Sequence, residues 1–408
     1  MSTVITADAI RLAFPALRRI HAGFPVAYFD GPGGTQVPDA VVQAMADYLL
    51  HHNANTHWVY PTSQETDALL VDARRSFAAF FNADPDEVVF GNNMTTITFH
   101  VARALARQWK PGDEVIVTEL DHHANVAPWQ AIARERGIVL RWLPFDPDSG
   151  RLHLDQLEQL VTPHTRLLAI GAASNALGTI NDVATASTIA HAGGALVYVD
   201  GVHYAPHVLP DVLSLGADFF ACSSYKFYGP HAGILWGRRD LLERLDVPKL
   251  DPAPNTAPHR LETGTQNHEG IVGAAAALRW IASISGEQSN LRTQLTTAYA
   301  ALHHRETTLF SQLWHGLAPL PRVRLYGPEA GTSRTGTMSF TVEGHASASI
   351  AAELAKRGCF VSNGDFYAST VARNYRVMEH GFVRVGVACY TTEDEIARLI
   401  NGVSELTA

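Results

Sequence analysis

From residue 88 to residue 200, short apolar runs alternate with segments in which apolar residues recur every three or four positions. The short runs are typical of buried strands, and the amphipathic segments between them are typical of helices. Strands that alternate with helices form a mainly parallel sheet with right-handed crossovers, so the sequence predicts an α/β fold. The predicted strands cover residues 88–90, 114–118, 139–143, 167–170 and 196–200.

Polar residues lie just beyond these predicted strands and beyond the next apolar run, at 218–222. In sheets of this kind, ligands bind in the crevice outside the carboxyl ends of the strands. Side chains from five separate strand ends should therefore meet at one crevice. They are Thr95, His123, Asn175, Asp200 and Lys226.

Asp200 and Lys226 suit one particular chemistry if they share a crevice. A lysine can form an imine with a cofactor aldehyde, and a carboxylate can keep a pyridine nitrogen protonated. The loop at 91–96, between a strand and a helix, could bind a phosphate with the free N–H groups of the helix N-terminus. The alternative interpretation is that Lys226 is a solvated loop lysine, while Asp200 and Thr95 only cap helices.

Charge and composition narrow the class of protein. The net charge of −9 and the pI near 6.1 argue against nucleic-acid or anionic-membrane partners. The first residues are too polar for a signal peptide, and no apolar run approaches the roughly 20 residues needed to span a bilayer. Three widely spaced cysteines form no disulfide framework or CxxC pattern,. We expect a cytoplasmic enzyme, and the 20 histidines leave a metal site as an alternative.

The pattern changes after the proline-rich stretch at 251–258. From about residue 290, long helical segments and short strands replace the regular alternation, which indicates a smaller α+β domain of typical size. We therefore expect a large cofactor-binding domain at 26–285, and a small domain formed by 1–25 and 286–408.

Five motifs in this chain, taken together, resemble those of a known family. They read DHHAN at 121–125, SNALGTI at 174–180, VDGVHYAPH at 199–207, SSYKFYGPHAG at 223–233 and ETGTQN at 262–267. The chain resembles the class V aminotransferase superfamily of fold type I pyridoxal-phosphate (PLP) enzymes, and within it the cysteine desulfurase-like branch. The resemblance runs from about residue 28 to residue 395. It implies a large domain with a mainly parallel seven-stranded sheet and a smaller α+β C-terminal domain.

The resemblance also implies roles for individual residues. Lys226 would carry PLP as an imine and later move the α-proton of the substrate. Asp200 would pair with the pyridine nitrogen, His123 would stack on the ring, and Asn175 would donate to the ring hydroxyl oxygen. The remaining positions around the ring and phosphate are Met94, Thr95, His203, Ser223 and Tyr225.

Further positions match substrate-binding and interface residues of the family. Arg384 would bind the substrate carboxylate, a task suited to a bidentate guanidinium, and Gly33 and Asn175 would lie beside it. Thr265 matches a residue that reaches the phosphate of the second protomer. The resemblance therefore implies a homodimer with a shared active site.

The chain departs from the desulfurase pattern where the catalytic cysteine is expected. Tyr367 takes the place of that cysteine, Ser362 the place of an arginine, and Trp58 replaces another arginine. The sequence therefore favours a C–S (β) lyase or a β/γ-replacement enzyme acting on a small amino acid, with Tyr367 as a candidate acid. The alternatives are a desulfurase that uses Cys359 or Cys389, an aminotransferase or an epimerase.

Two readings from other classes stay open at this point. Asp121, His122 and His123 resemble the DHH signature of metal-dependent phosphoesterases, with His203, His207 and His231 as possible ligands. This reading leaves Lys226 and Asn175 without a role. A non-catalytic dimeric scaffold or sensor is the other reading, and it does not explain why Lys226, Asp200 and Arg384 are all present.

Overall fold

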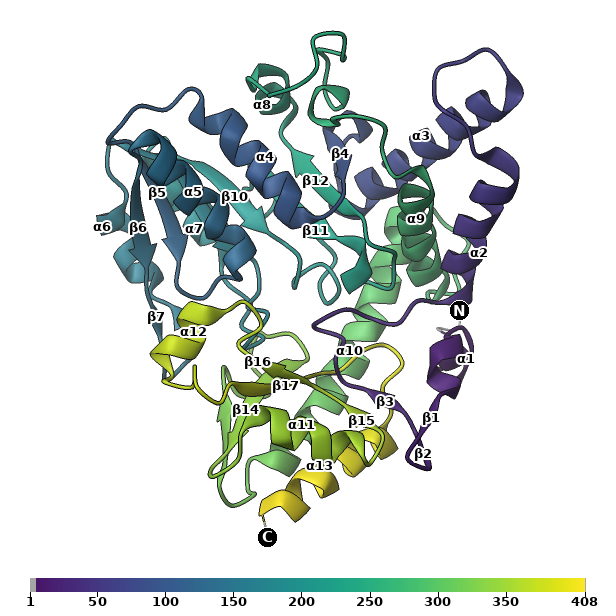
Figure 1. The fold of residues 1–408 in the computed structure, drawn as a ribbon, viewed down its shortest axis with the longest axis vertical. Helices are drawn as coiled ribbons and strands as arrows, with labels where there is room; N and C mark the ends of the chain where they lie inside the picture. The colour runs from purple at the N-terminus through teal and green to yellow at the C-terminus, as the bar shows by residue number, and fades with distance from the viewer. Residues whose placement is uncertain (1–4, 408) are drawn as a thin grey trace.

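The computed structural model describes residues 5–407, and its largest element is a seven-stranded sheet (Figure 1). Six of its strands run in one direction, and β12 runs opposite to both of its neighbours. The mainly parallel α/β sheet expected from the sequence is therefore confirmed. In spatial order the strands are β4 (Val88–Gly91), β12 (Gly233–Gly237), β11 (Phe219–Ser223), β10 (Leu196–Asp200), β9 (Thr165–Gly171), β5 (Glu114–Thr118) and β6 (Val139–Leu143).

Successive residues of the strands face opposite sides of the sheet and pack in two different cores. In β10, Val197 and Val199 belong to one buried cluster, while Tyr198 belongs to the other. This alternation follows from the pleat of a strand, and helices cover both faces. Helices on the first side are α3 (Pro61–Phe81), α7 (Val183–Ala192), α9 (His268–Ser283) and the start of α10 (Leu291–Leu317); those on the second are α4 (Met94–Ala106), α5 (Ala127–Arg136) and α8 (Arg239–Arg244).

A second, antiparallel sheet of four strands forms the lower part of the molecule in Figure 1. Its core lies between the sheet and the helices that cover it, and it includes Leu313, Phe340 and Leu399. The strands, in spatial order, are β13 (Val323–Tyr326), β14 (Thr337–Val342), β17 (Phe382–Gly386) and β16 (Ser362–Gly364). The helices of this part are the end of α10, α11 (Ser347–Ala355), α12 (Ser369–Asn374) and α13 (Glu393–Thr407).

Short elements link the two sheets. Strand β3 (Ala27–Tyr28) pairs in parallel with β15 (Cys359–Phe360), and Phe29 is buried in the core of the second sheet. The division at 26–285 stays a prediction. The other short elements are α1 (Ala7–Leu12), β1 (Ile20–His21), β2 (Phe24–Pro25), α2 (Asp39–Asp47), β7 (Phe145–Asp146), β8 (Arg151–Leu152) and α6 (Leu157–Leu160).

Within residues 5–407, no helix is both long enough and apolar enough to span a bilayer.

Candidate active site

A cavity of about 530 Å³ lies at the carboxyl ends of the strands of the large sheet. This volume is typical of a small-molecule site. The loops that follow β4, β5, β9, β10 and β11 all contribute to its wall. Of the residues predicted from the sequence, the wall contains Met94, Thr95, Asn175, Asp200, His203, Ser223, Tyr225 and Lys226.

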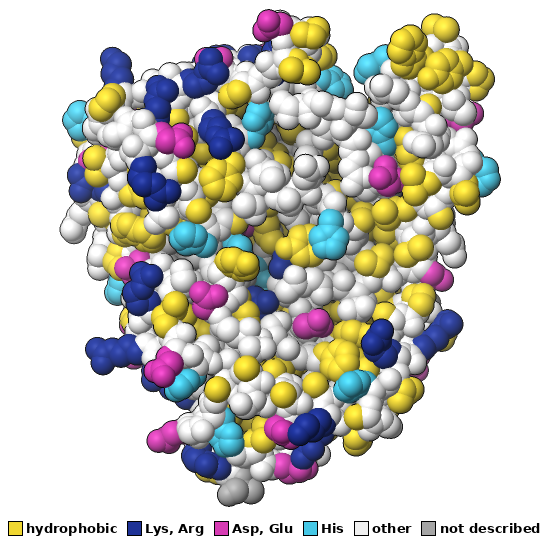
Figure 2. Space-filling model, in the orientation of Figure 1, with side chains coloured by type: hydrophobic (Ala, Val, Ile, Leu, Met, Phe, Trp, Pro, Cys, Tyr) yellow, Lys and Arg dark blue, Asp and Glu magenta, His cyan; other side chains and the backbone are white. Residues whose placement is uncertain are grey.

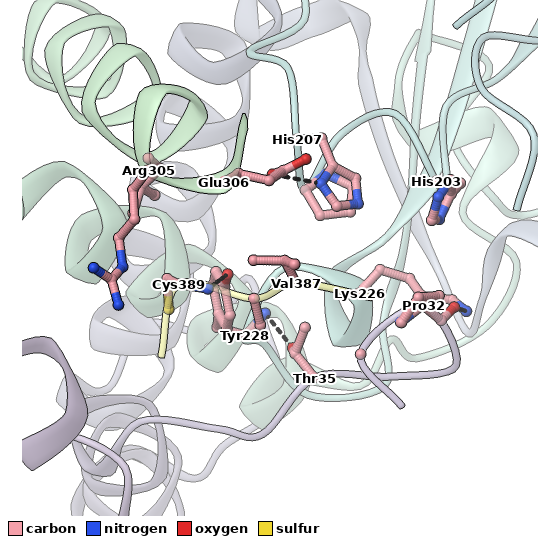
Figure 3. Close-up of a pocket in the computed structure, with 14 residues that line it drawn as sticks. Pro32, Thr35, His203, His207, Lys226, Tyr228, Arg305, Glu306, Val387 and Cys389 are labelled. Atoms are coloured by element: carbon pink, nitrogen blue, oxygen red, sulfur yellow. Dashed lines mark hydrogen bonds and ion pairs between the residues drawn. The ribbon is translucent and has the colours of Figure 1, made fainter. Parts of the chain in front are cut away.

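Lys226 ends the short 3₁₀ turn Ser224–Lys226 that follows β11. Its Nζ donates hydrogen bonds to the carbonyl oxygens of Pro32 (2.6 Å) and Gly33 (3.1 Å). Figure 3 shows the side chain directed toward Pro32, on the wall of a second, smaller cavity of about 30 Å³. Burial and the nearby Arg384 charge lower the pKa of Lys226 to about 7, and Asp200 opposes them. An amine with this pKa can act as a nucleophile and a base near neutral pH.

Asp200 is the last residue of β10 and is buried. Its Oδ1 accepts the N–H of Val202 at 2.9 Å, and no hydrogen bond to Oδ2 is found within residues 5–407. Burial raises the pKa of Asp200 to about 6, while Val202 and the Lys226 charge lower it. A buried carboxylate with a free oxygen needs a cationic or N–H partner.

The histidine on the cavity wall is His122, and His123 is absent from the described lining residues. The structure therefore places the neighbouring His122, and not the predicted His123, on the wall of the cavity, while the stacking role itself stays a prediction. The reason is local: His122 is the N-cap of the 3₁₀ turn His123–Asn125, and its Nδ1 accepts the N–H of Ala124 at 3.0 Å. The sequence shows the pair of histidines, but only the turn decides which ring faces inward.

The ring of His122 is neutral. Burial is the main cause, and the charges of Lys226 and Arg384 add to it, so that the pKa of His122 falls to about 3. Since Nδ1 accepts a hydrogen bond, the proton lies on Nε2. A neutral, partly buried ring of this kind can stack on a flat ligand without adding charge to the site.

Asp121, which precedes the two histidines, is buried, and its carboxylate is hydrogen-bonded within the protein. It accepts from Thr118 Oγ1, from the Gly171 N–H and from Asn125 Nδ2, at 2.7–2.8 Å. Among the described residues, no group of three His, Cys, Asp or Glu side chains is arranged to hold a metal ion. Asp121 therefore positions the loop that carries His122.

The N-terminus of α4 forms one end of the cavity. Asn93 caps this helix, because its side chain accepts the N–H of Thr96 at 2.9 Å. Ser223 Oγ accepts the N–H of Met94 at 3.0 Å and links the helix to the end of β11. The first turn of a helix offers free N–H groups and the positive end of its dipole, so this end suits a phosphate.

His203 belongs to a buried chain that leads away from the cavity. Its Nε2 lies 3.2 Å from Thr335 Oγ1, and its ring centroid lies 5.1 Å from that of His207. His207 in turn bonds Glu306 of α10 at 2.8 Å (Figure 3). Burial is the largest of the effects that lower the pKa of His203, so a neutral ring reaches the cavity wall.

Arg384 lies in the middle of β17 and is buried, with 4% of its surface exposed. Its Nη1 donates to the backbone oxygen of Asn175 at 3.0 Å. Gly33 lies close by, because a Cβ built on it would be 3.4 Å from Nη2 of Arg384. The structure thus brings together the three residues predicted to bind the substrate, although Arg384 and Gly33 are outside the described lining of the 530 Å³ cavity.

Two further predicted residues lie apart from the cavity wall. Tyr367 is 72% exposed, and its ring centroid lies 5.6 Å from that of His122. Thr265 is exposed and lines a separate cavity of about 280 Å³ beside the start of α4. Neither side chain reaches the 530 Å³ cavity within the described chain.

The residues of the cavity fit PLP. Lys226 offers an amine for the aldehyde, Asp200 a free carboxylate oxygen for the pyridine nitrogen, and the start of α4 a cradle for the phosphate. The buried Oδ1 of Asn175 also has no hydrogen-bond partner among the described residues, as expected of an atom that binds a ligand. Buried polar atoms are normally satisfied.

Comparison with known proteins agrees with this geometry. The profile of the family described as Aminotransferase class-V matches residues 27–399. The chain belongs to the class V aminotransferase family. It is therefore a PLP-dependent enzyme of the cysteine desulfurase-like kind, and the fold, cofactor and enzyme class expected from the sequence are confirmed.

Proteins similar to this class V chain align with it over almost its whole length. A cysteine desulfurase from Pectobacterium carotovorum is 32% identical, over 98% of this chain and 97% of its own. One from Klebsiella pneumoniae (strain 342) is 33% identical, over 98% of both chains. The crystal structure of the cysteine desulfurase CsdA from Escherichia coli superposes with a TM-score of 0.85 at 29% identity, over 100% of both chains. The apo structure of a cysteine desulfurase from Thermococcus onnurineus gives 0.89 at 28% identity, over 100% of this chain and 99% of the other.

Proposed function

We propose that this class V enzyme is a C–S (β) lyase, or a β/γ-replacement enzyme, that acts on a small amino acid. One observation carries the proposal: Lys226, Asp200 and Asn175 line the 530 Å³ cavity, while no cysteine of the described chain does so. Desulfuration through a persulfide needs a thiolate that reaches the substrate sulfur. The described wall of the cavity offers groups that suit PLP and no thiolate, which supports the proposal.

All three cysteines are buried, which argues against a non-standard nucleophile. Burial raises the pKa of Cys359 to about 11 and that of Cys389 to about 12, and it raises the pKa of Cys222 well above its ordinary value. Cys389 lines the small cavity behind Lys226, but its thiol stays protonated at neutral pH. A buried, protonated thiol behaves as a small hydrophobe.

When bound, PLP draws electrons away from the α-carbon of an attached amino acid. Asp200 would keep the pyridine nitrogen charged for this purpose, and the N-terminus of α4 would hold the phosphate. Arg384 binds the α-carboxylate through its guanidinium and so fixes the orientation of the Cα–H bond. Lys226, whose pKa burial lowers to about 7, would accept the α-proton,.

Tyr367 is the proposed acid for the departing sulfur. Its side chain is exposed at the mouth of the site, beside His122. A phenol hydroxyl there can donate a proton to a thiolate leaving group.

We also propose that the enzyme is a homodimer. Five exposed apolar side chains between the end of α2 and the start of α3 form the yellow group at the upper right of Figure 2. They are Leu49, Leu50, Trp58, Val59 and Tyr60. Apolar groups of this kind mark protein interfaces. Thr265 is exposed near the phosphate end of the site, where it is free to contact a second copy.

The test is incubation of the PLP-loaded protein with L-cysteine and with S-substituted cysteines, with pyruvate, ammonia and alanine measured together. Pyruvate and ammonia in equal amounts support elimination, and Lys226→Ala should abolish both. Alanine with sulfur bound to the protein would instead identify a desulfurase. A keto acid that retains the sulfur would identify an aminotransferase.

A further inference from the structure

Residues Asp365–Tyr367, here called the strap, run from β16 toward α12 and lie against the large domain. The carbonyl oxygen of Phe366 accepts a hydrogen bond from Asn175 Nδ2 at 2.9 Å, and that of Tyr367 accepts from the N–H of His123 at 2.7 Å. Both Phe366 and Tyr367 have φ of +56°, a left-handed conformation that side chains other than glycine rarely adopt,. Such strain persists only where the surroundings hold it.

The ring of Phe366 lies against the guanidinium of Arg384. The distance from Arg384 Cζ to the ring centroid is 4.1 Å, well inside the range of a cation–π contact,. Arg384 Nη1 binds the backbone oxygen of Asn175, whose side chain binds the backbone of Phe366. The three residues therefore form a closed triangle of contacts across two domains.

The charge of Asp30 acts on the guanidinium in this triangle and raises the pKa of Arg384, against the effect of burial, but it does not occupy the guanidinium in an ion pair. Arg384 Nε is buried without a hydrogen-bond partner among residues 5–407, and no carboxylate of the described chain forms an ion pair with Arg384. A buried cation without a partner is costly. The contacts thus hold the Arg384 guanidinium in place and leave some of its N–H donors free to bind an anionic ligand.

We propose that Phe366 is a positioning residue, which holds the Arg384 guanidinium in the orientation that recognises a substrate α-carboxylate. This role rests on the function proposed above. The aromatic face fixes the plane of the guanidinium, the Asn175 carbonyl fixes Nη1, and Nε and Nη2 stay available to the two carboxylate oxygens. Phe366 thereby selects α-amino acids over amines of the same size without touching the bond that breaks.

The experiment compares L-alanine with ethylamine, which is alanine without its carboxylate. Both are titrated into the PLP-loaded protein, and the shift of the visible cofactor band gives each Kd. The ratio of the two Kd values measures carboxylate recognition, and neither ligand has a sulfur to lose. Failure of the lyase proposal would therefore appear as normal alanine binding with no pyruvate from S-substituted cysteines.

Phe366→Leu and Phe366→Met, which stay apolar and fairly large but remove the aromatic face, should each lower this ratio by about 10-fold. Phe366→Tyr should restore it. Arg384→Leu should bring the ratio close to 1, and adding Phe366→Leu to that variant should cause no further loss. For a turned-over amino acid, the Phe366 variants should raise KM while kcat changes little.

A matched control is Phe24→Leu, because the ring of Phe24 faces Arg398 at 6.0 Å and is partly exposed far from the cavity. It should leave the ratio unchanged. The proposal is overturned if Phe366→Leu and Phe366→Met keep the wild-type ratio, or if they weaken alanine and ethylamine equally. Additive losses in the double variant would also overturn it, since Phe366 would then act independently of Arg384.

Discussion

At the scale of single residues, burial sets the chemistry of this site. It lowers the pKa of Lys226 to about 7, raises that of Asp200 to about 6, and lowers that of His122 to about 3. Near neutral pH the site therefore holds an amine that can lose its proton, a largely ionised carboxylate and a neutral imidazole. The low pKa of Lys226 has a consequence for stability that can be measured without any substrate.

We predict that the cofactor-free protein becomes more stable as the pH rises from 7 to 9. In this window the unfolded chain keeps the Lys226 proton, whose ordinary pKa is 10.5, while the folded chain loses it. Stability rises with pH wherever the unfolded state binds more protons, by up to about 1.4 kcal/mol per pH unit for one group. In urea unfolding, the free energy of unfolding of Lys226→Met should rise less steeply with pH than that of the wild type, by that amount. An equal slope of free energy against pH in both proteins would contradict the prediction.

The cysteines supply a second prediction at this scale. Cys359→Ala and Cys389→Ala remove buried thiols whose raised pKa values keep them protonated. We expect each variant to release pyruvate within about twofold of the wild-type rate, although the lost side chain should cost about 1 kcal/mol of stability. Thermal unfolding measured beside the activity separates these effects. A loss of product formation in a variant that remains folded would point to a catalytic cysteine.

At the scale of elements, the start of α4 forms the end of the cavity that we expect to bind the phosphate. The helix begins directly after β4, and its cap places its first N–H groups at the cavity. Gly233 of β12 lies against this turn, because a Cβ there would come within 2.5–2.8 Å of Asn93 backbone atoms. The strand therefore packs the turn in place from behind.

We predict that Asn93→Ala weakens PLP retention. Loss of the cap leaves the N–H of Thr96 without its partner and should cost about 1 kcal/mol, which frays the turn that holds the phosphate. Asn93→Ser keeps a capping oxygen and is the matched control. The measurement is the PLP absorbance that remains after dialysis, and equal retention by both variants would show that the cap does not matter for the phosphate.

At the scale of the whole molecule, the two sheets meet at the candidate active site. Arg384 comes from the small sheet, Asn175 from a loop of the large one, and Glu306 from the helix α10 that belongs to both cores. The exposed apolar group between α2 and α3 lies at the surface of the part built on the large sheet, at the upper right of the view (Figures 1 and 2). This is the surface on which we propose that a second copy packs.

We predict that Val59→Asp shifts the protein from dimer to monomer. Val59 is 93% exposed, so a charge there costs the monomer little but is unfavourable in an apolar interface,. Leu213→Asp is the control, since Leu213 is also exposed and lies beside the far end of the 21-residue α3, about 30 Å away, where the N–H of Val212 donates to the Phe81 carbonyl,. Sedimentation velocity gives the oligomeric state, and a wild-type monomer at micromolar concentration would refute the dimer.

The sequence by itself was sufficient for the α/β sheet, for the strand-end positions of Asp200, Asn175 and Lys226, and for the PLP chemistry that these residues imply. Strand periodicity and the chemistry of an acid and a lysine are local properties, so they can be read without coordinates. Local properties do not predict which of the two histidine side chains faces the cavity. His122 and His123 are neighbours in one motif, and only the hydrogen bonds of a 3₁₀ turn choose between them.

Contacts between distant segments were decided by the tertiary structure alone. Phe366, Asn175 and Arg384 lie in three separate stretches of chain, and nothing in their local patterns predicts that they form a triangle. The low pKa of Lys226 likewise depends on burial and on the charge of Arg384, which lies in the other sheet. Long-range packing sets both the environment of each charge and the orientation of each side chain, so these features follow only once the chain is folded.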